Sequence, residues 1–322
     1  MFTEAELDDA HRLVTRYMAP TPAHDWPLLA QALGTKVIIK HENHAPTGAF
    51  KVRGGITFMD WLKRNHPQME GIVTATRGNH GQSQARAATA MGLRAKIFVP
   101  HGNSTEKNAA MRAFGAELVE HGTDFDEARE AAMRTAESEP LFPVPPFHKE
   151  LVRGVATYGL ELFRAHPDLE VVYVPLGCGS GLCGTIAARD ALGLSTEIVA
   201  VVSERADGAK RSVEAGHLVE SDTAATFADG MAVRVPVQAA FDIYSEKAHH
   251  IGTVSDADIA DAIRLFYTAT HNLAEGAGAA GLALACKEKD SLRGRKVGVV
   301  LSGGNIDMRL LRILLQGDVP ET

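Results

Sequence analysis

The chain has 322 residues, of which 45% are hydrophobic and 23% are charged, and its formal net charge is −7. This composition is typical of a globular protein with a substantial core, and the acidic balance argues against a nucleic-acid-binding protein. No run of about 18 uncharged apolar residues predicts a membrane span, and the acidic N-terminal segment does not resemble a signal peptide. Three cysteines are too few for a disulfide framework and fit a reducing compartment, so we expect a cytoplasmic protein.

Short runs rich in valine and isoleucine alternate with amphipathic segments along the chain. The predicted strands cover residues 36–40, 71–75, 95–99, 171–175, 197–202 and 296–301. The predicted helices cover residues 82–91, 105–114, 124–137, 181–192 and 256–270. Such alternation predicts an α/β fold in which helices cover both faces of a parallel sheet. The segment SEPLFPVPPF, residues 138–147, has four prolines in ten residues and predicts a crossover between two lobes.

A glycine-rich turn, GCGSG at residues 177–181, lies between a predicted strand and a predicted helix. Backbone N–H groups and the positive end of a helix dipole at such a turn favour a phosphate, although packing alone also produces turns of this kind. Residues 179–184 match GxGxxG, and Glu204 follows 20 residues after Gly184. This spacing is that of dinucleotide-binding proteins, so the turn alone would predict an NAD-dependent oxidoreductase.

A second polar turn, TRGNHGQS at residues 76–83, follows the predicted strand at 71–75. Ligands of α/β proteins bind at this end of a strand, where Thr76 and the amides of a helix start can hold a carboxylate. Asn79 offers both a donor and an acceptor, and His80 is a candidate acid or base. The alternative is a helix cap with a glycine turn and no ligand.

The segment PTGAFKVRGG, residues 46–55, carries a single lysine, Lys51, in an irregular turn. A lysine nucleophile must be neutral, which requires a desolvated or cationic setting that lowers its pKa. Phe50, Val52 and Arg53 can supply that setting. An ordinary surface lysine would instead lie on a charged helix face, so we predict that Lys51 is reactive.

These three segments occur together with LSGGN at residues 301–305, and in this order they resemble the pyridoxal-phosphate enzymes of the tryptophan-synthase β-subunit fold (fold type II). The closest branch is that of the threonine and serine dehydratases and serine racemases. The resemblance covers residues 21–307 and implies an α/β fold with two open, twisted, mostly parallel sheets flanked by helices. It also implies a large cofactor-binding domain of residues 1–53 and 148–322, a small substrate-loop domain of residues 54–147, pyridoxal 5′-phosphate as the cofactor, and a homodimer.

The resemblance implies a role for each matching residue. Lys51 would form the Schiff base with the cofactor, Phe50 would pack beside the cofactor ring, and Ser302 would contact the pyridine nitrogen. The phosphate would be bound by Gly177, Cys178, Gly179, Ser180 and Gly181. Asn79 would bind the 3′-oxygen of the cofactor. The substrate carboxylate would be bound by Thr76, Arg77, Gly78, Asn79 and His80.

A neutral hydroxyl at the pyridine nitrogen does not hold that nitrogen protonated, which favours rapid loss of a β-leaving group. We therefore expect a dehydratase (ammonia-lyase) that converts a 3-hydroxy amino acid, such as threonine, serine or phenylserine, into a 2-oxo acid and ammonia. The open alternatives are the NAD-dependent oxidoreductase, a threonine-synthase-like β-replacement enzyme and an amino-acid racemase. Racemisation is disfavoured because Arg77 stands where the racemases carry a serine, and arginine is a poor acid or base.

Three further features complete these expectations. Glu275 opens a small-residue helix, either as a residue near the cofactor or as a favourable acid in a first helical turn. Residues 225–230, ATFADG, are expected to be structural. Glu204 and Asp207 lack the spacing of the divalent-cation site of some relatives, so no metal is expected.

Overall fold

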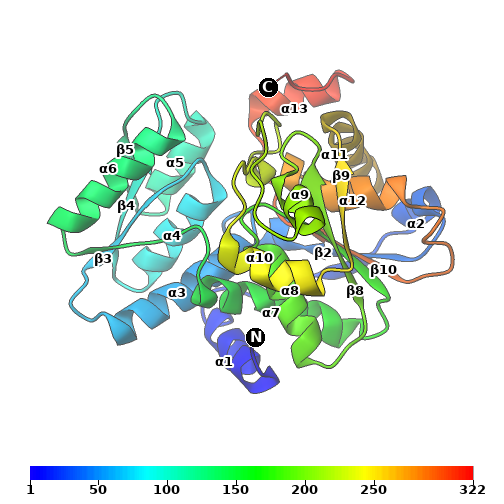
Figure 1. Cartoon of the computed structure of the whole chain (residues 1–322), viewed down its shortest axis with the longest axis horizontal. Coiled ribbons are helices and arrows are strands. Elements are labelled where there is room, and N and C mark those ends of the chain that lie inside the picture. The colour runs from blue at the N-terminus through cyan, green and yellow to red at the C-terminus, as the bar shows by residue number, and fades with distance from the viewer. Residues whose placement is uncertain (322) are drawn as a thin grey trace.

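Two sheets form the framework of the protein, and helices pack around both of them (Figure 1). The computed structural model describes residues 1–321. The six-stranded sheet contains, in spatial order, β1 (Ala23–Asp25), β2 (Val37–His41), β10 (Val297–Leu301), β7 (Val171–Pro175), β8 (Glu197–Ser203) and β9 (His250–Val254). β1 is antiparallel to β2, and the other neighbours are parallel.

The four-stranded sheet is parallel throughout. Its strands are, in spatial order, β5 (Glu117–Glu120), β4 (Arg94–Val99), β3 (Gly71–Ala75) and β6 (Leu141–Pro143). The proline-rich segment contributes β6, which lies at an edge, where a proline without an N–H group is tolerated. After β6 the chain crosses to the six-stranded sheet, so the predicted crossover is confirmed.

A layer of helices joins the two sheets. α3 (Lys51–Asn65) packs on α4 (Asn79–Ala90) of the four-stranded side and on α7 (Lys149–Ala165), and α7 packs on α8 (Ser180–Ala191). The remaining helices are α1 (Glu4–Val14), α2 (Pro27–Leu33), α5 (Thr105–Ala113), α6 (Phe125–Ser138), α9 (Gly208–Ala215), α10 (Gln238–Lys247), α11 (Asp256–Thr270), α12 (Gly276–Lys287) and α13 (Met308–Leu315), with short 3₁₀ turns η1 (Glu42–His44) and η2 (Asp229–Met231). None of the helices within residues 1–321 is long and apolar enough to cross a bilayer.

Both faces of the six-stranded sheet are buried, which explains why its central strands are continuous apolar runs. On one face Tyr173 and Val299 belong to a core cluster with residues of α11 and α12. On the other face Val172 and Val300 belong to a cluster with residues of α7 and α8. The predicted fold class, with two mostly parallel sheets flanked by helices, is confirmed. The two-domain division stays a prediction, and its first boundary, after residue 53, falls inside α3.

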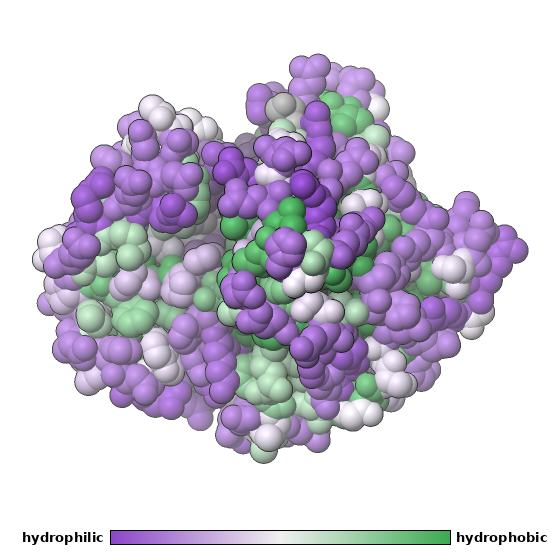
Figure 2. All heavy atoms as spheres, viewed as in Figure 1, coloured by the Kyte–Doolittle hydropathy of each residue, from purple (hydrophilic) through white to green (hydrophobic). Residues whose placement is uncertain are grey.

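Parallel strands bring their carboxyl ends to one edge, and four of these ends carry the segments that the sequence singles out. β2 leads into residues 42–50, β3 into residues 76–78, β7 into residues 176–179 and β10 into residues 302–307. These loops face the cleft between the two sheets, and the space-filling view shows a notch there beside α13 (Figures 1 and 2). The fold therefore gathers the predicted site residues in one place.

Candidate active site

Lys51 is the first residue of α3, and its backbone is held from two sides. The Phe50 N–H donates to the Ser302 carbonyl oxygen at 3.0 Å, which ties the segment to the end of β10. The Ser83 hydroxyl donates to the Lys51 carbonyl oxygen at 2.6 Å, which ties it to α4. The Lys51 Nζ lies 4.9 Å from the centre of the Phe50 ring. Lys51 therefore lies where the glycine loop, the asparagine loop and the LSGGN segment meet.

The surroundings of Lys51 favour the neutral amine that a nucleophile needs. Burial lowers its pKa, and Cys178 and Glu275 would oppose this shift only in their ionised forms. Arg53 does not contribute as predicted, because its buried guanidinium is paired with Glu42 at 2.8 Å and with Glu161 at 2.7 Å. The prediction that Arg53 lowers the pKa of Lys51 is wrong, and desolvation alone supplies the effect.

The glycine loop forms a cradle at the N-terminus of α8, which begins at Ser180. A Cβ atom on Gly177 would overlap the Gly230 carbonyl oxygen, and Gly179 has a φ of +101°, so neither position accepts a side chain easily. A Cβ on Gly181 would lie 3.4 Å from the Phe50 ring. The helix N-terminus is thus beside the residue that precedes Lys51. This arrangement fits a phosphate attached to a ring next to the lysine.

Cys178 and His80 both lie close enough to Lys51 to interact with its charge. Burial raises the pKa of the Cys178 thiol, which is therefore neutral. Burial and the Lys51 cation lower the pKa of His80 to about 3, so this imidazole is neutral as well. The buried His80 Nε2 has no hydrogen-bond partner in the part of the chain that the structure describes. Since buried polar atoms are normally hydrogen-bonded, this atom fits a bound molecule beside Lys51.

The asparagine loop is joined to two other segments through Asn79, the first residue of α4. The Asn79 Nδ2 donates to Glu275 Oε1 at 2.6 Å, and Asn79 Oδ1 accepts from Asn305 Nδ2 at 2.7 Å. Within the loop, the Gly78 N–H donates to the Thr76 hydroxyl at 3.1 Å. The structure therefore brings Asn79, Thr76 and Gly78 to the side of the site that faces α12 and the end of β10.

Glu275 precedes α12, and the two interpretations of this residue can now be separated. Its side chain makes no cap hydrogen bond to α12 within the described chain. It accepts from Asn79 instead, and burial raises its pKa to about 7 against the opposing effect of Lys107. The interpretation as a simple first-turn acid is wrong, and Glu275 belongs to the site.

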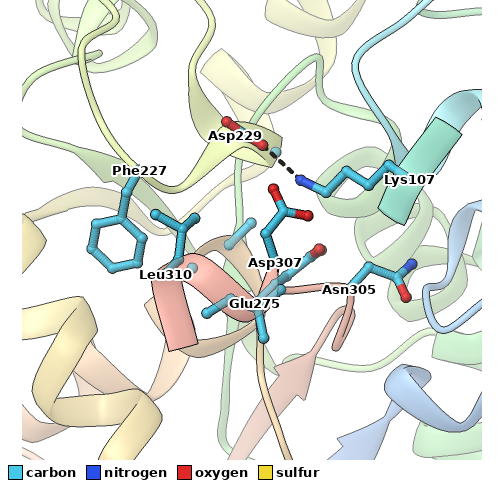
Figure 3. Close-up of a pocket in the computed structure, with 11 residues that line it drawn as sticks. Lys107, Phe227, Asp229, Glu275, Asn305, Asp307 and Leu310 are labelled. Carbon is cyan, nitrogen blue, oxygen red and sulfur yellow. Dashed lines mark hydrogen bonds and ion pairs between the residues drawn. The ribbon is translucent and has the colours of Figure 1, made fainter. Parts of the chain in front are cut away.

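The cleft above these residues consists of two adjoining pockets. The inner pocket is lined by, among others, Lys107, Asp229, Glu275, Asn305 and Asp307 (Figure 3). The outer pocket, of about 290 Å³, is lined by loop and helix residues from both sides of the cleft, including Arg77, residues 100–104, Asp307 and Arg309. Arg77 is exposed and lines the outer pocket, and it is not among the residues that line the inner one.

Sequence reasoning missed the residues that connect the two walls of this cleft. Lys107 Nζ of α5 pairs with Asp229 Oδ2 at 2.7 Å, as the dashed line in Figure 3 marks, and the Ser104 hydroxyl donates to Asp307. Asp229 belongs to the segment ATFADG, for which a structural role was expected, and its ion pair with Lys107 is a contact of that kind. Nothing in the local sequence pattern around Lys107 distinguishes it from a surface lysine.

Comparison with known proteins tests these assignments. A family model described as "Pyridoxal-phosphate dependent enzyme" matches residues 14–303. This chain belongs to that family. An L-threonine ammonia-lyase of Thermotoga maritima is 33% identical over 98% of this chain and 79% of its own length. An L-threo-3-hydroxyaspartate ammonia-lyase of a Pseudomonas species is 32% identical over 92% of this chain and 93% of its own length.

Solved structures agree with the family assignment. Threonine deaminase isoform 2 of Solanum lycopersicum has a TM-score of 0.90 and 28% identity, covering 98% of this chain and 89% of that chain. Maize serine racemase has a TM-score of 0.91 and 25% identity, covering 98% and 97% of the two chains. The predicted family, the cofactor and the status of an enzyme are confirmed. The dinucleotide interpretation of the glycine loop is dropped, because the family that contains this loop uses pyridoxal phosphate.

The tight packing of the cradle leads to a prediction about cofactor affinity. In Gly177→Ala the new methyl group must displace the Gly230 backbone, and such overpacking typically costs about 1–3 kcal/mol. We expect the Kd for pyridoxal phosphate, measured by titrating the apoenzyme, to rise about tenfold. The control is Gly193→Ala beyond the other end of α8, where a φ of +65° also strains an alanine but no atom lies within 4 Å of the added Cβ, so the variant reports backbone strain away from the cradle. Equal affinity of the two variants would show that Gly177 is not part of the cradle.

Proposed function

We propose that this protein is a pyridoxal-phosphate dependent ammonia-lyase that converts a 3-hydroxy amino acid into the corresponding 2-oxo acid and ammonia. The observation that carries the proposal is the position of Lys51, a partly buried side chain with a lowered pKa, between the glycine cradle and the Ser302 segment. The names of the relatives described above, which include ammonia-lyases for threonine and for 3-hydroxyaspartate, support the same reaction class.

When bound, pyridoxal phosphate supplies the electron sink that makes the α-proton of an amino acid removable. Lys51 would hold the cofactor, and its neutral Nζ would accept the α-proton of the substrate as a general base. The Ser302 hydroxyl would face the pyridine nitrogen and would add no charge there. The N–H groups at the start of α4, with Thr76, bind the substrate carboxylate.

The reaction balances without an oxidant or a second substrate. The α-carbon loses a proton to Lys51, and the β-carbon loses its hydroxyl group, which leaves as water after taking up one proton. Water then hydrolyses the unsaturated amine that has been released, giving the 2-oxo acid and ammonia. The Lys107–Asp229 pair and the Ser104–Asp307 hydrogen bond join the two walls of the cleft next to this site.

The site does not favour racemisation. A racemase needs a second acid or base for the α-carbon besides the lysine, and the position before Gly78 holds Arg77. That side chain is exposed in the outer pocket, and a guanidinium rarely gives up its proton. We assign Arg77 instead to the part of the cleft that accommodates the group on the β-carbon.

The test is a panel of serine, threonine, threo-3-hydroxyaspartate and phenylserine, each given to the holoenzyme as the only substrate. Ammonia and 2-oxo acid are measured together. We expect equal amounts of both products from at least one member of the panel. A holoenzyme that releases no ammonia from any member, or that forms product only when a second nucleophile is added, would contradict the proposal and favour a β-replacement enzyme.

A homodimer and a cytoplasmic location complete the proposal. Both come from the resemblance and the composition of the sequence. Light scattering after size-exclusion chromatography tests the first, because a dimer has twice the chain mass of 34.4 kDa. A monomer with full activity would contradict it.

A further inference from the structure

Three side chains from separate segments form a continuous hydrogen-bonded chain across the cleft. Asn305, after β10, donates through Nδ2 to Asn79 Oδ1 at 2.7 Å, and Asn79 donates through Nδ2 to Glu275 Oε1 at 2.6 Å. Asn79 begins α4 of the four-stranded side, whereas the other two residues belong to the six-stranded side. Figure 3 shows Glu275 and Asn305 in the inner pocket below the Lys107–Asp229 pair.

The Asn305 end of this chain is anchored to the segment that carries Lys51. The Asn305 Nδ2 also donates to the Thr47 carbonyl oxygen at 2.8 Å. A Cβ on Gly48 would overlap the Asn305 Oδ1, so the glycine lets the Asn305 amide lie directly against the backbone. Both hydrogens of the Asn305 amide nitrogen are thereby used, and the Asn305 side chain has one orientation that satisfies both acceptors.

The orientation of the Asn79 amide is set by its two hydrogen-bond partners, Asn305 and Glu275. Its oxygen faces an amide donor, and its nitrogen faces a carboxyl oxygen, so the flipped amide would lose both hydrogen bonds and place two oxygens together. An amide nitrogen carries two hydrogens, and Glu275 accepts only one of them. The second remains available to an acceptor in the site.

We propose that Glu275 is a positioning residue that, with Asn305, holds the Asn79 amide as a hydrogen-bond donor toward the 3′-oxygen of the cofactor. This inference rests on the proposed function, because it takes Asn79 as the residue that contacts that oxygen. Glu275 acts through Asn79 and does not itself touch the reacting atoms.

The electrostatic surroundings of Glu275 agree with this role. Burial raises its pKa to about 7, the Lys107 cation and the Asn79 hydrogen bond lower it, Asp229 raises it, and Lys51 lowers it. The carboxylate accepts from Asn79 when it is charged, and its carbonyl oxygen accepts when it is protonated. Glutamine at this position also offers a carbonyl oxygen, so Glu275→Gln preserves the hydrogen bond, whereas Glu275→Ala removes it.

The experiment measures cofactor affinity rather than turnover. Apoenzymes of wild type, Glu275→Ala, Glu275→Gln, Asn79→Ala and the double variant Asn79→Ala/Glu275→Ala are titrated with pyridoxal phosphate, and thermal unfolding of each apoenzyme checks that it is folded. We expect Glu275→Ala to raise the Kd at least about fivefold, the loss expected for one hydrogen bond. Glu275→Gln restores most of the affinity.

The double variant separates positioning from a general structural effect. If Glu275 acts through Asn79, removing Glu275 from the Asn79→Ala background changes the Kd no further, so the two substitutions are not additive. Additive effects, or an unchanged Kd in Glu275→Ala, would overturn the inference while leaving the proposed function intact. A wild-type apoenzyme that does not bind pyridoxal phosphate would overturn the proposed function itself.

Discussion

Replacing Lys51 by alanine is expected to lower kcat for ammonia release by at least about 10³-fold, because a general base alone typically accelerates a reaction by about 10²–10⁴-fold. The variant also loses the covalent anchor of the cofactor, so saturating pyridoxal phosphate does not restore the rate. Folding is expected to persist, since burial opposes the charge of the Lys51 amine in the native state. Steady-state kinetics of the reconstituted enzyme, with 2-oxo acid as the measured product, check this result.

The matched control is another lysine of the same helix. Lys63 is exposed near the end of α3, where its Nζ donates to the Met91 carbonyl oxygen. Lys63→Ala is expected to retain wild-type turnover. A Lys51→Ala variant that turned over as fast as Lys63→Ala would contradict the assignment of Lys51.

The second large effect concerns stability. Arg53→Met is expected to lower the free energy of unfolding by about 3–5 kcal/mol, because breaking a buried ion pair leaves its partner charged and uncompensated. The Arg53 Nε lies 2.8 Å from Glu42 Oε2, the Arg53 Nη1 lies 2.7 Å from Glu161 Oε1, and both Arg53 and Glu42 are fully buried. Lys40 remains beside Glu161 at 2.6 Å and compensates only part of the charge. Urea denaturation of the apoenzyme measures the change.

Arg64 provides the comparison on the same helix. Its pair with Asp60 is at 2.6 Å, but the Arg64 side chain is 59% exposed, so the pair is screened by water. Arg64→Met is expected to change the free energy of unfolding by only about 0–1 kcal/mol. Equal stability of the two variants would show that the buried network around Arg53 does not support the fold.

The strands that were predicted from the sequence and the strands that were not differ in their position. The predicted ones became β2, β3, β4, β7, β8 and β10, which occupy the interior of the two sheets. The others, β1, β5, β6 and β9, are the edge strands. A buried parallel strand needs a continuous apolar run, which is visible in a sequence, whereas β5 begins and ends with exposed glutamates and β6 ends in Pro143. Edge strands therefore show little of the apolar pattern from which a strand can be predicted.

The site residues, like the strands, could be predicted only where the local sequence pattern is distinctive. Lys51, Asn79 and the glycine loop lie at strand ends, where the chemistry of a parallel sheet is expected, and local sequence was enough to select them. Lys107 became a site residue only because α5 faces η2 across the cleft, which no local pattern encodes. Arg53 was assigned to Lys51 for its proximity in sequence, whereas its acceptor Glu161 lies 108 residues away.

Locating the cofactor on the chain tests the assignment of Lys51 most directly. The holoenzyme is reduced with borohydride, which fixes the covalent bond between the cofactor and its lysine, and is then digested and analysed by mass spectrometry. We expect a phosphopyridoxyl group on the peptide that contains Lys51, and we expect it to be absent from that peptide in Lys51→Ala. A label on a different lysine in the wild type, or an active enzyme with no label, would contradict it.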